Sequence, residues 1–158
     1  MPDLNLGDLR IESPTFPAGG AIPDRCSSPG GDTAPALRWS GVPDGTVELA
    51  LVVHDPDAPL VDGFTHWVVH GIDPGTTGVG EGGFPDDAVV TGPNQTGDAA
   101  YMGPAPPPGH GPHHYFFHLY ALDVPLGDEP LSRDELQERI EGHVLAQARL
   151  VGTFEQTG

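Results

Sequence analysis

The sequence predicts a single, mainly β domain that ends in one helix. Apolar runs of strand length, rich in β-branched and aromatic residues, alternate with turn-forming loops, and only one segment has helical apolar spacing. The 158 residues include 23 glycines and 19 prolines, which favour turns over long helices. A chain of this length can bury one core, so we expect residues 1–158 to form one domain.

The first half of the chain predicts turns and edge strands followed by a central strand. Residues 1–45 are rich in Pro, Gly, Ser and Asp and hold only short apolar pieces, such as Leu37-Arg-Trp39. We expect edge strands and turns there. The run Glu48-Leu-Ala-Leu-Val-Val53 is continuously apolar between turn residues, which predicts a strand buried on both faces. Asp55 should lie at the end of that strand.

The middle of the chain predicts loops and then a second strong strand. Gly, Asp and Thr dominate residues 73–100, which indicates long surface loops with one short strand near Ala88-Val-Val90. Tyr115–Leu122 is aromatic and apolar over strand length. We therefore expect the two strongest strands to begin near residues 48 and 115.

Only the C-terminal region has a helical pattern. Ser132 and Glu135 have the spacing of a capping box, which marks the beginning of a helix. Four apolar residues then recur at intervals of four and form one stripe: Leu136, Ile140, Val144 and Ala148. We expect a helix from Ser132 to Gly152 that packs on the β body as a cover.

The composition is strongly acidic, with 23 Asp and Glu against six Arg, no Lys, and a formal net charge of −17. Such a field repels phosphate backbones and anionic lipid surfaces, so we expect no nucleic-acid partner and no stable membrane association. Missing lysine with abundant aspartate resembles halophilic proteins adapted to molar internal salt, as in haloarchaea. No segment resembles a membrane helix or a signal peptide, so we expect a cytoplasmic chain.

Two histidine-bearing segments carry the functional signal. The first runs from Asp55-Pro-Asp-Ala-Pro59 to His66-Trp-Val-Val-His70, and the second from Gly103-Pro-Ala-Pro-Pro-Pro108 to His113-His-Tyr115. In each, a rigid proline-rich loop leads directly into an aromatic, β-branched strand, which holds the polar groups at the strand end in fixed positions. This arrangement is typical of a small-ligand pocket.

Strand alternation predicts which of these side chains converge. Successive residues point to opposite faces, so His66 should face away from Trp67, whereas His113 and Tyr115 should share a face. If the two histidine strands are neighbours, His66 lies near His113 and Tyr115, and Asp55 arrives from a third strand. The set would offer two imidazoles, a phenol and a carboxylate.

These motifs resemble the phosphatidylethanolamine-binding protein family, in the bacterial and archaeal branch called Raf-kinase-inhibitor-like. The resemblance runs from about Phe16 to Phe154. It is carried by the two segments above, together with Tyr101-Met-Gly-Pro104 and Gly111-Pro-His-His-Tyr115; both hallmarks in order make a specific signal. The resemblance implies two antiparallel sheets in Greek-key order with a C-terminal helix.

The resemblance also implies a pocket for small phosphate-type anions or phosphorylated ligands, without a metal or cofactor. Matched residue by residue, the pocket comprises Asp55, His66, Gly103, Pro104, His113 and Tyr115, with Pro59 and Phe64 on its rim. N–H groups near Gly103, both imidazoles and the Tyr115 hydroxyl would donate to phosphate. Without lysine or arginine, binding should be weak and should strengthen as the histidines become protonated.

The two aspartates beside this pocket are expected to differ in role. Asp55 would orient an imidazole or pair with a ligand ammonium such as ethanolamine. Asp57 would shape the proline turn through Asx-type hydrogen bonds.

Three classes of function stay open at this point. A binding module fits best, because the family resemblance implies one and no serine lies in a Gly-x-Ser-x-Gly elbow, and we expect no enzyme. The first alternative is a weak phosphoester hydrolase with His66 and His113 as acid–base pair and Asp55 as orienter. The second is a histidine-rich metal-binding protein, with the same three side chains around zinc. Analogy alone adds regulation of a kinase or another protein partner, and both a monomer and a homodimer are compatible.

Overall fold

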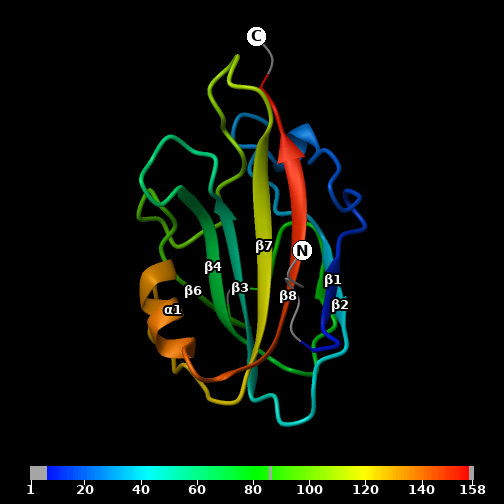
Figure 1. The fold of residues 1–158 in the computed structure, drawn as a ribbon, viewed down its shortest axis with the longest axis vertical. Helices are drawn as coiled ribbons and strands as arrows, with labels where there is room; N and C mark the ends of the chain where they lie inside the picture. Colours follow the sequence, from blue (N-terminus) through cyan, green and yellow to red (C-terminus); the bar gives the residue numbers. More distant parts are fainter. Residues whose placement is uncertain (1–6, 86, 157–158) are drawn as a thin grey trace.

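The computed structural model describes residues 7–85 and 87–156, and within them the chain forms two antiparallel sheets (Figure 1). The smaller sheet has the order β1 (Arg10–Glu12), β2 (Leu37–Ser40), β5 (Gly78–Val79). The larger sheet has the order β6 (Val90–Thr91), β4 (Phe64–Ile72), β3 (Glu48–Asp55), β7 (His113–Leu122), β8 (Val144–Phe154). A short 3-10 helix, η1 (Asp24–Cys26), and one α-helix, α1 (Arg133–Ile140), complete the described elements. The predicted fold class is confirmed.

Strand β3 is the centre of the larger sheet, and every one of its residues is buried. Leu49, Leu51 and Val53 pack into the core between the two sheets, whereas Ala50 and Val52 pack into a second core against α1. This two-sided burial explains why the run carries no polar alternation. The prediction of a strand buried on both faces is confirmed, and Asp55 is its last residue.

The helix begins as predicted but ends early. The Ser132 side chain accepts a hydrogen bond from the Glu135 N–H, and the Glu135 carboxylate accepts one from the Ser132 N–H. This reciprocal capping box is the predicted one. The helix ends at Ile140, and Gly142, with φ 81°, lies in the turn that follows.

The remainder of the predicted helix is wrong, because Val144 and Ala148 belong to strand β8. A spacing of four residues satisfies a helical stripe, but apolar residues at this spacing also fit a strand. A bulge in β8 puts Val144 against the core beneath α1 and Ala148 in the core between the sheets. In β8, Ala146, Ala148 and Leu150 point into the core between the sheets. Pairing with β7 along the whole strand supplies the backbone hydrogen bonds that a helix would have made internally.

The loop region between β4 and β7 largely follows the prediction. The expected short strand near residue 90 is β6, which pairs with β4. The other short strand, β5, was not predicted, because Gly78–Val79 has neither the length nor the composition of a strand. It is formed by pairing with β2.

A buried polar pair braces the core beneath α1. The Glu48 carboxylate accepts hydrogen bonds from the Gly71 N–H at 2.8 Å and the Leu126 N–H at 3.0 Å. His70 is fully buried beside it, with its Nε2 donating to the Glu129 carbonyl at 2.9 Å and its Nδ1 3.6 Å from the Glu48 carboxylate. These bonds connect β3 and β4 to the 122–131 loop, so His70 acts in the core and away from the candidate site.

Candidate functional site

A cavity of about 270 Å³ opens where β3, β4 and β7 carry their polar residues. Six of the eight predicted site residues line it: Asp55, Pro59, Phe64, His66, His113 and Tyr115. The rest of the wall is mainly apolar and comes from the two proline-rich loops: Ala58, Leu60, Met102, Ala105, Pro106 and Pro107. The cavity thus has four polar side chains, which are two imidazoles, a carboxylate and a phenol, and the rest of its wall is apolar.

A β-bulge turns His66 toward this cavity. β3 and β4 pair Val53 with Trp67 but His54 with Thr65, so β4 carries one residue more than β3 across this interval. A bulge interrupts the alternation of side chains and re-aims one of them. The His66 ring lies 5.2 Å from that of Tyr115, and Tyr115 and Trp67 both belong to the core between the two sheets. The prediction that His66 and Trp67 face opposite sides is wrong for this reason.

The strand order also differs from the simplest expectation. The strands that carry His66 and His113 are not neighbours, because β3 lies between β4 and β7. Asp55, at the end of β3, therefore lies between the two histidine strands. The three side chains still converge, since adjacent strands are only about 5 Å apart.

Asp55 orients His113. Its Oδ2 lies 2.7 Å from His113 Nδ1, and both side chains are almost fully buried. Because a carboxylate only accepts, the proton of this bond lies on Nδ1, which leaves Nε2 as the other polar atom of the ring. Asp55 Oδ1 accepts the Asp57 N–H at 2.7 Å. Both carboxylate oxygens are thus engaged, which favours the orienting role over pairing with a ligand ammonium.

Asp57 does not make the predicted Asx-type turn; Asp55 makes it, through the bond to the Asp57 N–H. The Asp57 carboxylate instead accepts hydrogen bonds from the N–H and the Nδ1 of His114, both at 2.8 Å. These bonds fix the beginning of β7 against the 56–59 turn. His114 itself is half exposed and does not line the cavity.

His66 has a different electrostatic environment from His113. Its Nδ1 lies 2.7 Å from the Met102 carbonyl, which only accepts, so Nδ1 carries the proton. Burial lowers the pKa of His66 to about 4. At neutral pH the ring is therefore uncharged, and Nε2 accepts hydrogen bonds. The expectation that both imidazoles donate to an anion holds for His66 only in acid.

The Tyr115 ring lies 5.2 Å from His66, edge-on, and 6.5 Å from His113. Burial, and to a smaller extent the charge of Asp55, raise the pKa of the Tyr115 phenol far above its ordinary value. The hydroxyl therefore stays protonated and available as a donor.

Gly103 and Pro104 are not among the residues that line the cavity. The Gly103 N–H donates to the Asp32 carboxylate at 2.8 Å, and the Pro104 carbonyl accepts the Ser28 N–H at 2.9 Å. Gly103 also lies so close to the Cys26 carbonyl that a Cβ would overlap it. These residues hold the 101–105 segment against the 26–32 loop, and the Gly103 N–H is already used.

The metal alternative gains no support in residues 7–85 and 87–156, where no three His, Cys, Asp or Glu side chains are grouped to hold a metal ion. The two imidazoles and the carboxylate instead bond to groups of the chain itself.

Histidines whose pKa is lowered on folding should make stability fall in mild acid. Burial lowers the pKa of both His66 and His118 to about 4, whereas each titrates near 6.5 when unfolded. Between these values the unfolded chain binds more protons, so the free energy of unfolding should fall as pH falls, by up to about 1.4 kcal/mol per pH unit for each histidine. Urea unfolding from pH 7 to 5 at constant KCl measures this slope. His118→Gln should reduce this slope, to which His54 also contributes because burial lowers its pKa, and an unchanged slope would contradict the assignment.

The comparisons with known proteins agree with the fold and the motifs. A sequence model described as phosphatidylethanolamine-binding protein matches residues 12–155. The UPF0098 protein of Methanothermobacter thermautotrophicus is 42% identical over 154 residues, covering 94% of this chain and 99% of the relative.

Two solved structures share the fold along almost their whole length. A phosphatidylethanolamine-binding protein homologue of Chlamydia trachomatis superposes with a TM-score of 0.87 at 37% identity, covering 94% of this chain and 97% of that one. E. coli YbcL, described as a member of the mammalian PEBP family, gives a TM-score of 0.88 at 30% identity, covering 96% and 100%.

A relative from Mycobacterium tuberculosis, 46% identical over 149 residues and covering 93% of this chain and 72% of the relative, carries the provisional name lipoprotein LppC. In the described part of this chain, no helix has the length and apolar character needed to cross a membrane. The cytoplasmic location stays a prediction.

Proposed function

We propose that this chain, which belongs to the phosphatidylethanolamine-binding protein family, is a binding module for small phosphate monoesters such as the phosphoethanolamine head group. The observation that carries the proposal is the convergence of His113, paired with buried Asp55, and uncharged His66 in one cavity. Family membership supports a ligand-binding module, and the chemistry of the cavity supports the choice of ligand.

The two imidazoles suit the monoanion of a phosphate monoester. Such a monoanion has one P–OH donor and several acceptor oxygens. His66 Nε2 can accept the P–OH, while His113 Nε2–H and the Tyr115 hydroxyl can donate to the other oxygens. His113 Nδ1 already donates to Asp55, so its Nε2 can donate to the ligand only when the ring is an imidazolium. That imidazolium would lie between the ligand and the Asp55 carboxylate. The second pKa of a phosphate monoester is about 6, so affinity should rise as pH falls from 8 to 6.

The apolar wall suits the carbon part of the ligand. Pro59, Phe64 and Met102 line the cavity beside the polar groups and would contact a short alkyl chain. No lysine or arginine lines the cavity, so binding should be weak. A phosphorylated segment of a protein partner carries the same monoester, and this shared chemistry is what connects the proposal to regulation of a kinase or another partner.

Calorimetric titration tests the proposal, with about 2 M KCl to screen the acidic surface and a chelator present. O-phosphoethanolamine should bind saturably and several-fold more tightly at pH 6 than at pH 8, inorganic phosphate more weakly, and ethanolamine not at all. Equal affinity at the two pH values, or equal binding of ethanolamine, would contradict it. A phosphoserine peptide distinguishes the source: tighter binding than O-phosphoethanolamine would favour a protein ligand.

One observation favours the alternative that the protein is a phosphoester hydrolase. Acid–base catalysis needs two groups in different protonation states, and the buried, uncharged His66 lies in the same cavity as the Asp55-paired His113. Release of inorganic phosphate from p-nitrophenyl phosphate at a rate that His66→Ala removes would favour this alternative. Binding without release over hours would leave the binding module as the function.

A further inference from the structure

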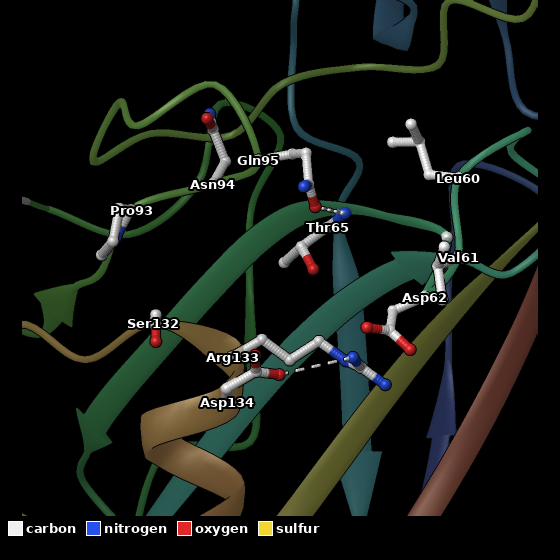
Figure 2. A pocket seen from close by; sticks show the side chains of 11 residues that line it. Leu60, Val61, Asp62, Thr65, Pro93, Asn94, Gln95, Ser132, Arg133 and Asp134 are labelled. Carbon is white, nitrogen blue, oxygen red and sulfur yellow. Dashed lines mark hydrogen bonds and ion pairs between the residues drawn. The ribbon is translucent and has the colours of Figure 1, made fainter.

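A second cavity, of about 390 Å³, lies on the other face of the larger sheet (Figure 2). Thr65 lines it, whereas the residues on either side, Phe64 and His66, line the first cavity, so β4 separates the two. Its walls come from three separate segments, residues 60–65, 93–95 and 132–134. The proposed function makes no use of this space.

Arg133 is the cation of this cavity, in a chain that has only six basic side chains other than histidine. Its side chain is 25% exposed, and its ion pair with Asp134 spans 3.9 Å, longer than a hydrogen bond. Asp134 is a neighbour on the same helix, with a side chain that is 90% exposed. The Arg133 side chain is thus partly buried, while this carboxylate leaves its N–H donors open to a better acceptor.

Two further polar side chains line the cavity, Thr65 and Gln95, and hydrogen bonds hold both in place. The Gln95 side-chain oxygen accepts the Thr65 N–H at 3.2 Å, which directs its amide N–H groups away from that strand. His54 Nε2 donates to the Asp62 carbonyl at 2.7 Å, so Nδ1 accepts the Thr65 hydroxyl at 3.1 Å. The Thr65 oxygen keeps its acceptor capacity for a ligand.

The charges are arranged with the cation inside and the acids outside. Figure 2 shows the Arg133 guanidinium between Asp134 and Asp62, with Thr65 and Gln95 on the side of β4. Both aspartates are exposed, whereas Arg133 is partly buried. A ligand that carried only negative charge would meet two carboxylates at the rim, and one that carried only positive charge would meet the guanidinium inside.

We propose that this cavity binds a small zwitterion, with its carboxylate on Arg133 and its ammonium group toward Asp62 and Asp134. An Arg–carboxylate contact can be bidentate, and the amide of Gln95 can donate to the same carboxylate. The volume accommodates a molecule of the size of an amino acid or a dipeptide. The two cavities share Leu60 but no charged residue, so the charged groups of this site differ from those of the phosphate cavity.

Amide-resolved NMR titration with 4-aminobutanoate tests the proposal, with butanoate and butylamine as probes that lack one of the two charges. The backbone amide signals of Thr65, Gln95 and Arg133 should shift saturably with 4-aminobutanoate. Each single-charge probe should bind at least about tenfold more weakly, because each loses one charge-assisted contact. Equal affinity for butanoate, or no saturable shift up to about 100 mM, would overturn the proposal.

Two arginines on one helix give a matched control. Arg133→Gln should weaken 4-aminobutanoate at least about tenfold, whereas Arg139→Gln, at a half-exposed position outside the cavity, should not change it. Asp62→Asn should weaken 4-aminobutanoate but not butanoate. Unchanged binding in Arg133→Gln would overturn the proposal, and His113→Asn should leave this site unaffected whatever its effect on phosphate.

Discussion

We expect His113→Asn to weaken the binding of O-phosphoethanolamine by about 10- to 100-fold while the domain stays folded, because one charge-assisted hydrogen bond is lost. The asparagine amide can still donate to Asp55 from nearly the position of Nδ1, so the buried carboxylate keeps its partner. What disappears is Nε2, the ring atom that donates to the anion when His113 is an imidazolium; His66 cannot replace it, because His66 is uncharged at neutral pH. Calorimetric titration measures the change.

His114→Asn is the matched control for this variant. His114 follows His113 directly, but it is half exposed and its ring bonds to Asp57. Its replacement should leave the affinity for O-phosphoethanolamine within about threefold of the original, as expected for a group outside the cavity. Full binding by His113→Asn would exclude His113 as the anion donor, and equal losses in both variants would indicate a general effect of charge.

The second large effect concerns stability: Trp67→Ala should lower the free energy of unfolding by about 3–5 kcal/mol. The Trp67 side chain is 4% exposed, and its ring centroid lies 5.9 Å from that of Phe84 and 5.4 Å from that of Tyr101. Removing the ring leaves a cavity in the core between the two sheets. Urea unfolding at pH 7 in about 2 M KCl measures the loss.

Val61→Ala provides the control for this measurement. Val61 is fully exposed at the tip of the 56–63 loop, so its truncation should change the free energy of unfolding by less than about 0.5 kcal/mol. A loss below about 1 kcal/mol for Trp67→Ala would contradict its place in a well-packed core.

Local signals in the sequence predicted most of the fold. The apolar run of β3 predicted its burial on both faces, and the capping box marked the beginning of α1, because each depends on residues close together in the chain. The end of α1 could not be found in this way. Val144 and Ala148 fit a helical stripe as well as they fit a bulged strand, and only pairing with β7 decides between them.

The candidate site shows the same division between local and long-range information. The motifs identified Asp55, His66, His113 and Tyr115, which line one cavity. The bulge at His66 was not predictable, because a bulge is a property of two paired strands.

The roles of individual groups were harder to predict than their location. The bond between the Gly103 N–H and Asp32 joins residues 71 positions apart, and no local pattern indicates it. The different environments of the two imidazoles depend likewise on the distant Met102 carbonyl and on Asp55. Sequence motifs therefore identify these side chains, while the protonation state of each depends on the folded neighbours.

NMR of the histidine ring nitrogens tests the central claim most directly, with O-phosphoethanolamine added at near-neutral pH in molar KCl and with a chelator present. Before addition, His66 should be uncharged with its proton on Nδ1. On addition, saturable shifts should be confined to His66 and His113, with His113 moving toward the imidazolium form. Shifts only at histidines outside the cavity, such as His118 or His143, or no saturable shift at all, would contradict the account.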